Sequence, residues 1–378
     1  MKLKKILVLA LCCVMAVGLL PAVSFADDSV TRILACSDFQ NPDGNDAGKQ
    51  VVSAVVRSIQ NNGVDAVDAF FCCGDYDHDL TMLPGPTAEG VKALGEAVSP
   101  IVPDGAQKVF VQGNHDCASG LAGLAVSGNN DPKSGKYGLF VINEDDYSWF
   151  NASREVVKGT AENLKTYLNE KLESGFTAPV FVLSHLPLHY SYRSRLIGDG
   201  RWAHYIFDVL NEAGEKGLNI IFLFGHDHSN GWDDYLGGAC ICLEKGDSIN
   251  IGKLGNTLKW DAFDLNFTYM NAGYTGYYDN HNGADDALTM TVFEITDTQV
   301  TVNRYDAEGL HNVASAGKRN DYKNETGYEP NTDVKASPVV IPLTAVADSS
   351  PMESALDRLA AFIMRIYEFL KKTVASIC

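Results

Sequence analysis

The sequence is short of positive charge. Its 378 residues include 30 Lys and Arg against 48 Asp and Glu, which gives a formal net charge of −18 at pH 7. A surface this acidic repels nucleic acid and anionic membranes over most of its area. We therefore expect no nucleic-acid binding. A phosphate-bearing ligand would need a local attraction, such as a bound metal cation.

Cysteines are also few for a disulfide-stabilised protein. Nine occur, and Cys12 and Cys13 lie near the start, so an odd number remains in the rest of the chain. A chain of this length can bury a large apolar core and needs no disulfide for stability. Cys240 and Cys242 form a close pair, but no second pair exists to complete a four-cysteine metal site. We interpret most of the cysteines as structural.

The first 26 residues have the pattern of a secretory signal peptide. Lys2, Lys4 and Lys5 precede an apolar run from Ile6 to Leu20, and small residues end the segment at Ala26. The run is short for a membrane-spanning helix, so cleavage after Ala26 is favoured over a retained anchor. The mature chain is therefore expected to be secreted or extracytoplasmic, at the cell surface or in a periplasm.

From Thr31 onwards, short apolar runs alternate with amphipathic segments. Strands are expected at residues 32–37, 67–73, 108–112, 179–184 and 219–224, and helices at 48–60, 88–97, 161–173 and 201–213. This alternation predicts βαβ units and a substantially parallel sheet. Four later strands, at 239–243, 268–274, 288–295 and 299–305, have no helices between them. They predict an antiparallel extension of a second sheet, with a hairpin turn at 296–298.

The chain is expected to divide into one large domain and a tail. Residues 27–319 form the domain, residues 320–350 are polar and predict a linker, and residues 351–378 predict an amphipathic helix. The apolar residues at helical spacing in this tail are Leu356, Leu359, Ile363, Ile366, Tyr367 and Leu370. The helix either packs back on the domain or contacts a membrane, the cell surface or a partner, and the pattern favours neither.

Each of the five alternating strands ends in side chains that can bind a metal. The strands lead in turn to Asp38 and Gln40, to Asp75, to Asn114, to His185, and to His226 and His228. Strand ends in an α/β sheet converge at one edge, and residues two apart in extended chain project to the same side. Gly74, Gly113 and Gly225 each precede a ligand and permit close backbone approach. Mixed oxygen and imidazole donors suit Mn²⁺, Fe²⁺ or Zn²⁺.

These blocks resemble a known signature. Gly74-Asp75, Gly113-Asn114-His115-Asp116, His185 and Gly225-His226-Asp227-His228 are similar, in order and spacing, to the motifs of calcineurin-like metallophosphoesterases. The likeness spans roughly residues 32–295. It implies an α/β fold, a four-layer αββα sandwich in which two mixed β-sheets pack together between flanking helices.

The resemblance also implies a site for two divalent metal ions. The first would be held by Asp38, Gln40, Asp75 and His228, and the second by Asp75, Asn114, His185 and His226, so that Asp75 bridges. His115 would protonate the leaving group, and Asp116 would orient His115. The family usually has His where Gln40 stands. We therefore expect Gln40 to bind through its carbonyl oxygen, with altered metal preference or weaker affinity at the first site.

The expected activity is hydrolysis of a small phosphorylated substrate, namely a phosphomonoester, a phosphodiester or a nucleotide pyrophosphate. Two cations roughly 3.5–4 Å apart would hold a bridging hydroxide for in-line attack on phosphorus. His78, His189, Arg193 and Arg195 lie close to the metal blocks in sequence and are candidates for substrate binding. The alternative is a catalytically weak or inactive family member that acts as a surface binding or interaction module. Gln40 and His78 favour that alternative, because the family usually has His at the first position and Asp or Asn at the second. The intact blocks at 114–116 and 226–228 oppose it.

Overall fold

The structure is a computed structural model of the chain. It describes residues 30–40, 46–77, 84–121, 124, 126–147, 152–189, 202–226, 242–253, 256–276, 288–310, 313–314, 334–335 and 338–344. The predicted signal peptide (1–26) and the predicted C-terminal helix (351–378) lie outside the described residues.

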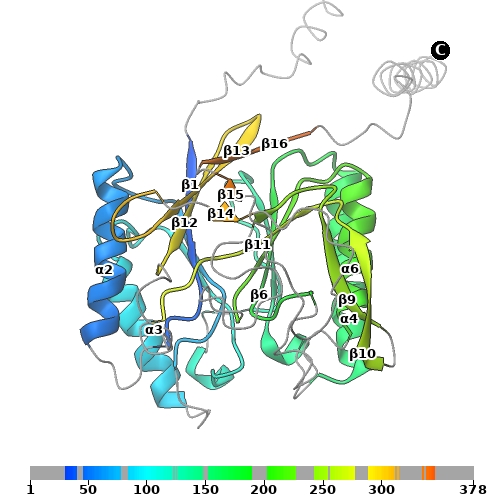
Figure 1. The fold of residues 1–378 in the computed structure, drawn as a ribbon, viewed down its shortest axis with the longest axis horizontal. Coiled ribbons are helices and arrows are strands. Elements are labelled where there is room, and N and C mark those ends of the chain that lie inside the picture. The colour runs from blue at the N-terminus through cyan, green and yellow to red at the C-terminus, as the bar shows by residue number, and fades with distance from the viewer. Residues whose placement is uncertain are drawn as a thin grey trace, which may run out of the picture. The chain divides into compact units, whose positions relative to one another are not determined.

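Two six-stranded sheets form the middle of the fold (Figure 1). The strands of the first sheet are β1 (Thr31–Cys36), β2 (Ala69–Cys72), β3 (Gln107–Phe110), β12 (Met290–Ile295), β13 (Gln299–Tyr305) and β16 (Val339–Pro342). Those of the second are β4 (Gly128–Asn129), β5 (Gly138–Ile142), β6 (Val180–Ser184), β7 (Ile220–Phe224), β8 (Cys242–Leu243) and β11 (Thr268–Asn271). Their spatial orders are β16-β13-β12-β1-β2-β3 and β4-β5-β6-β7-β11-β8.

The βαβ part of each sheet is parallel, as predicted. β1, β2 and β3 pair in parallel in the first sheet, and β5, β6, β7 and β11 do so in the second. β12, β13 and β16 continue the first sheet in antiparallel pairing from β1. In each sheet the carboxyl ends of the parallel strands therefore open at a common edge.

Helices cover the outer face of each sheet. α2 (Asp46–Asn61) and α3 (Pro84–Val98) pack on the first sheet, and α4 (Arg154–Glu173) and α6 (Ala203–Glu215) pack on the second (Figure 1). In α2, Val52, Val55, Val56 and Ile59 follow the 3.6-residue period, so one stripe of the helix is buried. These layers are the αββα sandwich that the family resemblance implies.

An apolar layer with aromatic rings joins the two sheets. The ring of Phe181 in β6 meets Phe71 of β2, Tyr137 and Phe293 of β12 in edge-to-face contacts, with centroids 5.8, 6.0 and 5.2 Å away. Edge-to-face rings interact favourably beyond the area that they bury. Phe181 is fully buried and ties strands of both sheets together.

The prediction for the late strands was partly wrong. The hairpin between β12 and β13 is present, but these strands join the first sheet rather than a second one. β11 is parallel to β7, and in the second sheet β8 pairs antiparallel at the edge. An apolar segment without neighbouring helices carries no sign of which edge it will join, because sheet edges far apart in sequence offer equivalent hydrogen-bonding groups.

The predicted linker and several short elements also need correction. Within residues 320–350, β16 pairs with β13, so the domain extends beyond residue 319 to at least Thr344. β5 and the hairpin of β9 (Ser248–Lys253) and β10 (Asn256–Asp264) were not predicted from the sequence; the hairpin packs beside α6. The remaining short elements are η2 (Ala118–Leu121), η3 (Glu144–Asp146) and the ribbon of β14 (Val313–Ala314) with β15 (Val334–Lys335).

Among the described helices, none has the length and apolar character needed to cross a membrane.

Phe181→Ala should lower the free energy of unfolding by about 3–5 kcal/mol, because it removes a buried aromatic ring and leaves a cavity between the sheets. The measurement is urea unfolding in the presence of a chelator, so that metal binding does not contribute. The control is Val340→Ala on β16, a side chain that is 46% exposed, for which a change within about 0.5 kcal/mol is expected. Equal unfolding midpoints for the two variants would contradict the role given to Phe181.

Candidate metal centre

Five strand ends bring the predicted ligands together at one edge. Asp38 follows β1, Asp75 follows β2, Asn114 follows β3, His185 follows β6 and His226 follows β7. Backbone hydrogen bonds join these loops: Asp38 N–H donates to Gly74 O at 2.9 Å, and Gly225 N–H donates to His185 O at 2.9 Å. The open edges of the two sheets thus meet, and residues nearly 200 positions apart become neighbours.

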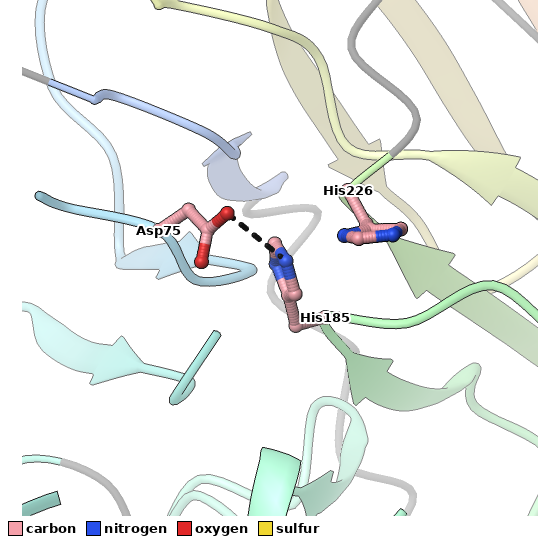
Figure 2. Close-up of side chains that lie close together, drawn as sticks. All are labelled: Asp75, His185 and His226. Atoms are coloured by element: carbon pink, nitrogen blue, oxygen red, sulfur yellow. Dashed lines mark ion pairs between the residues drawn. The ribbon is translucent and has the colours of Figure 1, made fainter. Parts of the chain in front are cut away.

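Asp75, His185 and His226 form the centre of this cluster (Figure 2). One ligand atom from each lies within 4.8 Å of the others, and all three residues are buried. Asp75 Oδ2 lies 3.3 Å from His185 Nε2. Asn114 Oδ1 lies 2.9 Å from His185 Nε2 and 2.8 Å from His226 Nδ1. Carboxylate, amide and imidazole donors that converge in this way fit a divalent transition-metal ion.

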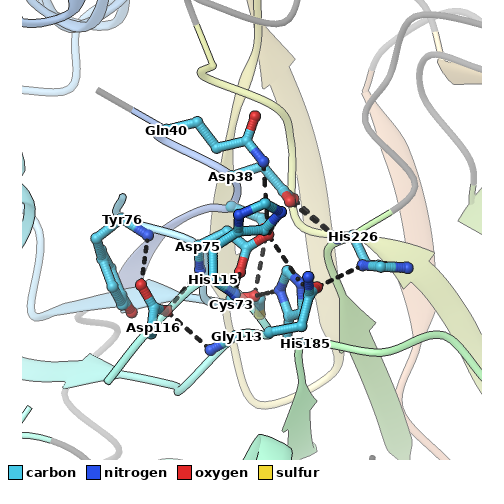
Figure 3. A network of polar contacts seen from close by, with 12 residues as sticks. Asp38, Gln40, Cys73, Asp75, Tyr76, Gly113, His115, Asp116, His185 and His226 are labelled. Atoms are coloured by element: carbon cyan, nitrogen blue, oxygen red, sulfur yellow. Dashed lines mark hydrogen bonds and ion pairs between the residues drawn. The ribbon is translucent and has the colours of Figure 1, made fainter. Parts of the chain in front are cut away.

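Asp38 and Gln40 border the same cluster (Figure 3). The Asp38 carboxylate accepts a hydrogen bond from His226 N–H at 2.9 Å, and Gln40 Nε2 lies 3.5 Å from Asp75 Oδ2. Both residues are only 1% exposed. Six of the seven predicted ligands are therefore placed together, while His228 lies outside the described residues.

The backbone at these ligands is unusual. Asp38, Gln40, Asp75 and His226 have φ values of 53°, 43°, 59° and 67°, and within the described part of the chain they are the non-glycine residues with positive φ. Such conformations disfavour side-chain-bearing residues and concentrate at functional sites. All four are predicted metal ligands, so the fold holds strained backbone where the side chains must converge.

The three glycines before the ligands are needed for close approach, as predicted. A Cβ on Gly225 would collide with Ser37 Oγ and would lie 2.8 Å from both Asp38 Oδ2 and Cys73 O. A Cβ on Gly113 would collide with the Asp75 carboxylate, and one on Gly74 would lie 2.7 Å from His185 Nδ1. The glycines thus leave the space that the ligand side chains occupy.

The carboxylate of Asp116 bonds to backbone rather than to the His115 ring in the contacts that the structure defines. Its Oδ2 accepts from the N–H groups of Asp75 and Gly113, each at 2.8 Å, and its Oδ1 accepts from Tyr76 N–H at 2.9 Å (Figure 3). Asp116 is fully buried. It therefore holds the loop that bears Asp75 against the loop that bears Asn114, a positioning role different from the predicted one.

His115 lies at the accessible side of the cluster. Its N–H donates to Asp75 Oδ1 at 3.0 Å, and its Nε2 lies 3.9 Å from Asp75 Oδ2. The His115 side chain is 19% exposed, compared with 1% for Asp75 and none for His185. His115 therefore borders the cluster and is the most solvent-accessible of these three side chains.

The charges around Asp75 favour a cation. Burial alone raises the pKa of Asp75, but the His185 and His115 rings outweigh burial and hold this pKa well below its usual range. Burial lowers the pKa of His185, yet the Asp75 charge overcomes it and raises this pKa to about 10. Burial and the Asp75 charge raise the pKa of Asp116 to about 7. A positive charge beside Asp75 is thus stabilised, and a metal ion would supply it.

His185 is oriented by a group that the sequence did not reveal. Its Nδ1 lies 2.7 Å from Cys73 O, and that carbonyl also accepts from Ser37 Oγ at 3.0 Å. A histidine ligand commonly donates one ring N–H to a backbone carbonyl, which leaves the other nitrogen for the metal. Backbone carbonyls are present in every sequence, so no residue pattern marks this one.

The loop after β11 also supports the site and was not predicted to do so. Thr275 donates through both N–H and Oγ1 to Ser37 O, each at 3.1 Å, directly beside Asp38. The available signal was positional, because β11 is a parallel strand that ends beside β7. No Asp or His follows β11 directly, so the sequence did not mark this strand end as part of the site.

Of the four residues predicted to bind substrate, the structure describes one, His189. His189 is fully buried, its Nδ1 lies 2.9 Å from Tyr269 Oη, and its ring packs edge-on against Phe224. These contacts place His189 in the apolar layer beneath α6 and favour a structural role over substrate contact. His78, Arg193 and Arg195 lie outside the described residues.

A family model for calcineurin-like phosphoesterases matches residues 31–230. The chain belongs to this family. It is therefore a metal-dependent phosphoric ester hydrolase, and the family works with two metal ions. No curated protein matched the sequence.

Three solved structures are similar to part of this chain at low identity. A dimetal phosphatase from Danio rerio is 10% identical with a TM-score of 0.48, and the match covers 75% of this chain and 98% of that one. A purple acid phosphatase from yellow lupin seeds is 10% identical with a TM-score of 0.45, over 79% of this chain and 55% of that one. The structure of PhoD is 11% identical with a TM-score of 0.43, over 78% and 74%.

Gly225→Ala should abolish metal binding, because the added Cβ displaces Asp38 and the neighbouring strand end. Metal content after purification and dialysis, measured by elemental analysis, tests this. The control is Gly159→Ala in α4, where a Cβ meets nothing within 4 Å. That variant should keep its metal and gain about 0.5–1 kcal/mol of stability, as expected for glycine replaced within a helix. Full metal content in Gly225→Ala would refute the assignment of Asp38.

Asp116→Asn should weaken metal binding by roughly 10–100-fold, the usual cost of losing a group that supports a ligand. One of the three backbone N–H groups would then face an amide NH₂ and lose its acceptor. Competition with a fluorescent zinc chelator gives the affinity. Asp297→Asn, in the exposed turn between β12 and β13, is the matched control. Unchanged affinity in Asp116→Asn would show that Asp116 does not position the ligand loops.

Proposed function

We propose that this protein is an exported phosphoesterase that hydrolyses a small phosphorylated substrate with the help of two divalent metal ions. The observation that carries the proposal is the buried convergence of Asp75, Asn114, His185 and His226 beside a partly exposed His115. The substrate classes that fit this donor set are phosphomonoesters, phosphodiesters and nucleotide pyrophosphates.

The metal ions would be divided between two overlapping ligand sets. Asp38, Gln40, Asp75 and His228 would hold the first ion, and Asp75, Asn114, His185 and His226 would hold the second. The first set is richer in oxygen donors because Gln40 replaces the usual histidine, so it should favour Mn²⁺ or Fe²⁺ over Zn²⁺. Bound divalent cations would supply Lewis-acid stabilisation of the phosphoryl oxygens and a more acidic nucleophilic water.

The protein's own groups would orient the reaction. Asp116 and the Cys73 carbonyl keep Asp75 and His185 fixed, so no reorganisation is needed when charge develops on the substrate. His115 would donate the proton to the departing oxygen, a contribution of roughly 10²–10⁴-fold. The acidic surface would repel anionic substrates elsewhere, which confines productive encounters to the metal centre.

Export completes the proposal. The apolar segment after Lys5 supports removal of residues 1–26 during secretion, with the mature enzyme at the cell surface or in a periplasm.

The test is hydrolysis by the mature chain, Asp27–Cys378, loaded with Mn²⁺, Fe²⁺ or Zn²⁺. The substrates are an aryl phosphate, an aryl phosphodiester and a nucleotide pyrophosphate. His115→Ala should lower kcat by roughly 10²–10⁴-fold while the metal content stays the same. Asp75→Asn should lose both activity and metal. His204→Ala on α6, a histidine outside the ligand cluster, should change neither.

The outcomes distinguish a phosphoesterase from the alternative, a family member that binds a ligand without turnover. Turnover that requires metal and falls in both site variants supports the phosphoesterase. Two bound ions per chain without turnover on any substrate would favour a binding module. Gln40, which stands where the family usually has His, is the reason to test this alternative. Absence of bound metal in the unmodified chain would overturn the ligand assignment itself.

A further inference from the structure

A groove lies at the sheet edge opposite the metal centre. It has a volume of about 310 Å³ and is formed where β7 and β11 begin, with the last described residues, Ile341–Thr344, as one wall. The metal ligand His226 follows the other end of β7, so the two sites occupy opposite ends of the same strand. An occupant of the groove would not obstruct the phosphoesterase site.

The chain is fastened to the wall of this groove. Thr344 N–H and Oγ1 donate to Asn219 Oδ1 at 3.0 and 3.1 Å, and Asn219 Nδ2 donates to Thr344 O at 2.9 Å. Leu343 N–H donates to Thr298 O at 2.8 Å. Every backbone and side-chain polar group of Thr344 is therefore bonded to one asparagine. The segment that follows must start from the groove itself.

The groove offers apolar surface with a charged rim. Leu218, Ile220 and Phe267 are buried residues that line it, and Ile341 and Leu343 in its wall are partly exposed. Glu244 and Lys245 stand at the rim and supply one charge of each sign. Apolar side chains that remain partly exposed beside a concave surface are stabilised when another apolar surface covers them.

We propose that residues 352–372 of this same chain occupy the groove and bury their apolar stripe there. The stripe consists of Leu356, Leu359, Ile363, Ile366, Tyr367 and Leu370, which lie at helical spacing. Eleven residues lie between Thr344 and Leu356. When extended, this stretch reaches about 40 Å, far more than the groove requires.

Tethering strengthens this contact. A segment that starts at the groove wall meets the groove at an effective concentration of order millimolar, so even a weak apolar contact is populated. A free membrane-binding helix would instead meet the repulsion of a strongly acidic protein from anionic lipid.

Photo-crosslinking in the mature full-length chain tests the proposal. p-Benzoylphenylalanine is placed at Lys245, which is exposed on the rim, and cross-linked peptides are identified by mass spectrometry after irradiation. Cross-links to peptides from residues 351–372 are expected. The same reagent at Lys158, on the outer face of α4, is the control and should not reach those peptides.

Two variants of the C-terminal segment test whether the cross-link depends on its apolar stripe. Leu359→Asp with Ile363→Asp should reduce the cross-link roughly tenfold or more, because charge would enter the apolar groove. Ala361→Asp, on the opposite face of the expected helix, should leave it unchanged. Circular dichroism melting verifies that each variant is folded, independently of phosphoesterase activity.

Two results would overturn the proposal. One is absence of tail peptides among the Lys245 cross-links of the folded protein. The other is equal cross-linking in the double variant and in Ala361→Asp. Binding of the unmodified chain to vesicles of anionic phospholipid, together with absent cross-links, would assign the tail to a membrane instead.

Discussion

Burial of a negative charge at Asp75 is the constraint on which this site depends. A carboxylate that is 1% exposed must be matched by positive charge and hydrogen-bond donors, or it takes up a proton. His185 Nε2 lies 3.3 Å away, and His115 N–H donates to the other oxygen. Because His185 comes from the second sheet and Asp75 from the first, this pairing also fixes how the two open edges face each other.

Packing within the sandwich offsets the backbone strain in the loops that bear the ligands. Four ligands have left-handed backbone, a conformation that costs of order 1–3 kcal/mol each where the residue is not glycine. The layer between the sheets, with Phe181 among three other rings, supplies favourable packing that does not depend on metal. Asp116 then connects the two regions, since its bonds hold the loops after β2 and β3 at the edge of that rigid core.

The two ends of the sheets have different chemistry. One end gathers buried ligands for cations within an otherwise acidic protein, so that phosphate is attracted where it can react. The other end holds the largely apolar groove, and one of its walls is the segment from β16 to Thr344, which is bonded to Asn219. Because the two sites lie at opposite ends, residues 352–372 can occupy the groove without changing the metal centre.

The sequence by itself determined the α/β class, the βαβ strands and the cluster of ligands, because polar residues after apolar strands must emerge at one edge. Only the tertiary structure decided which sheet received β11, β12 and β16, since edge pairing leaves no local sequence signal. It also assigned Asp116 to backbone amides and made Cys73 O the partner of His185. Such contacts depend on where a backbone group lies in space, and residue identity alone does not encode that position.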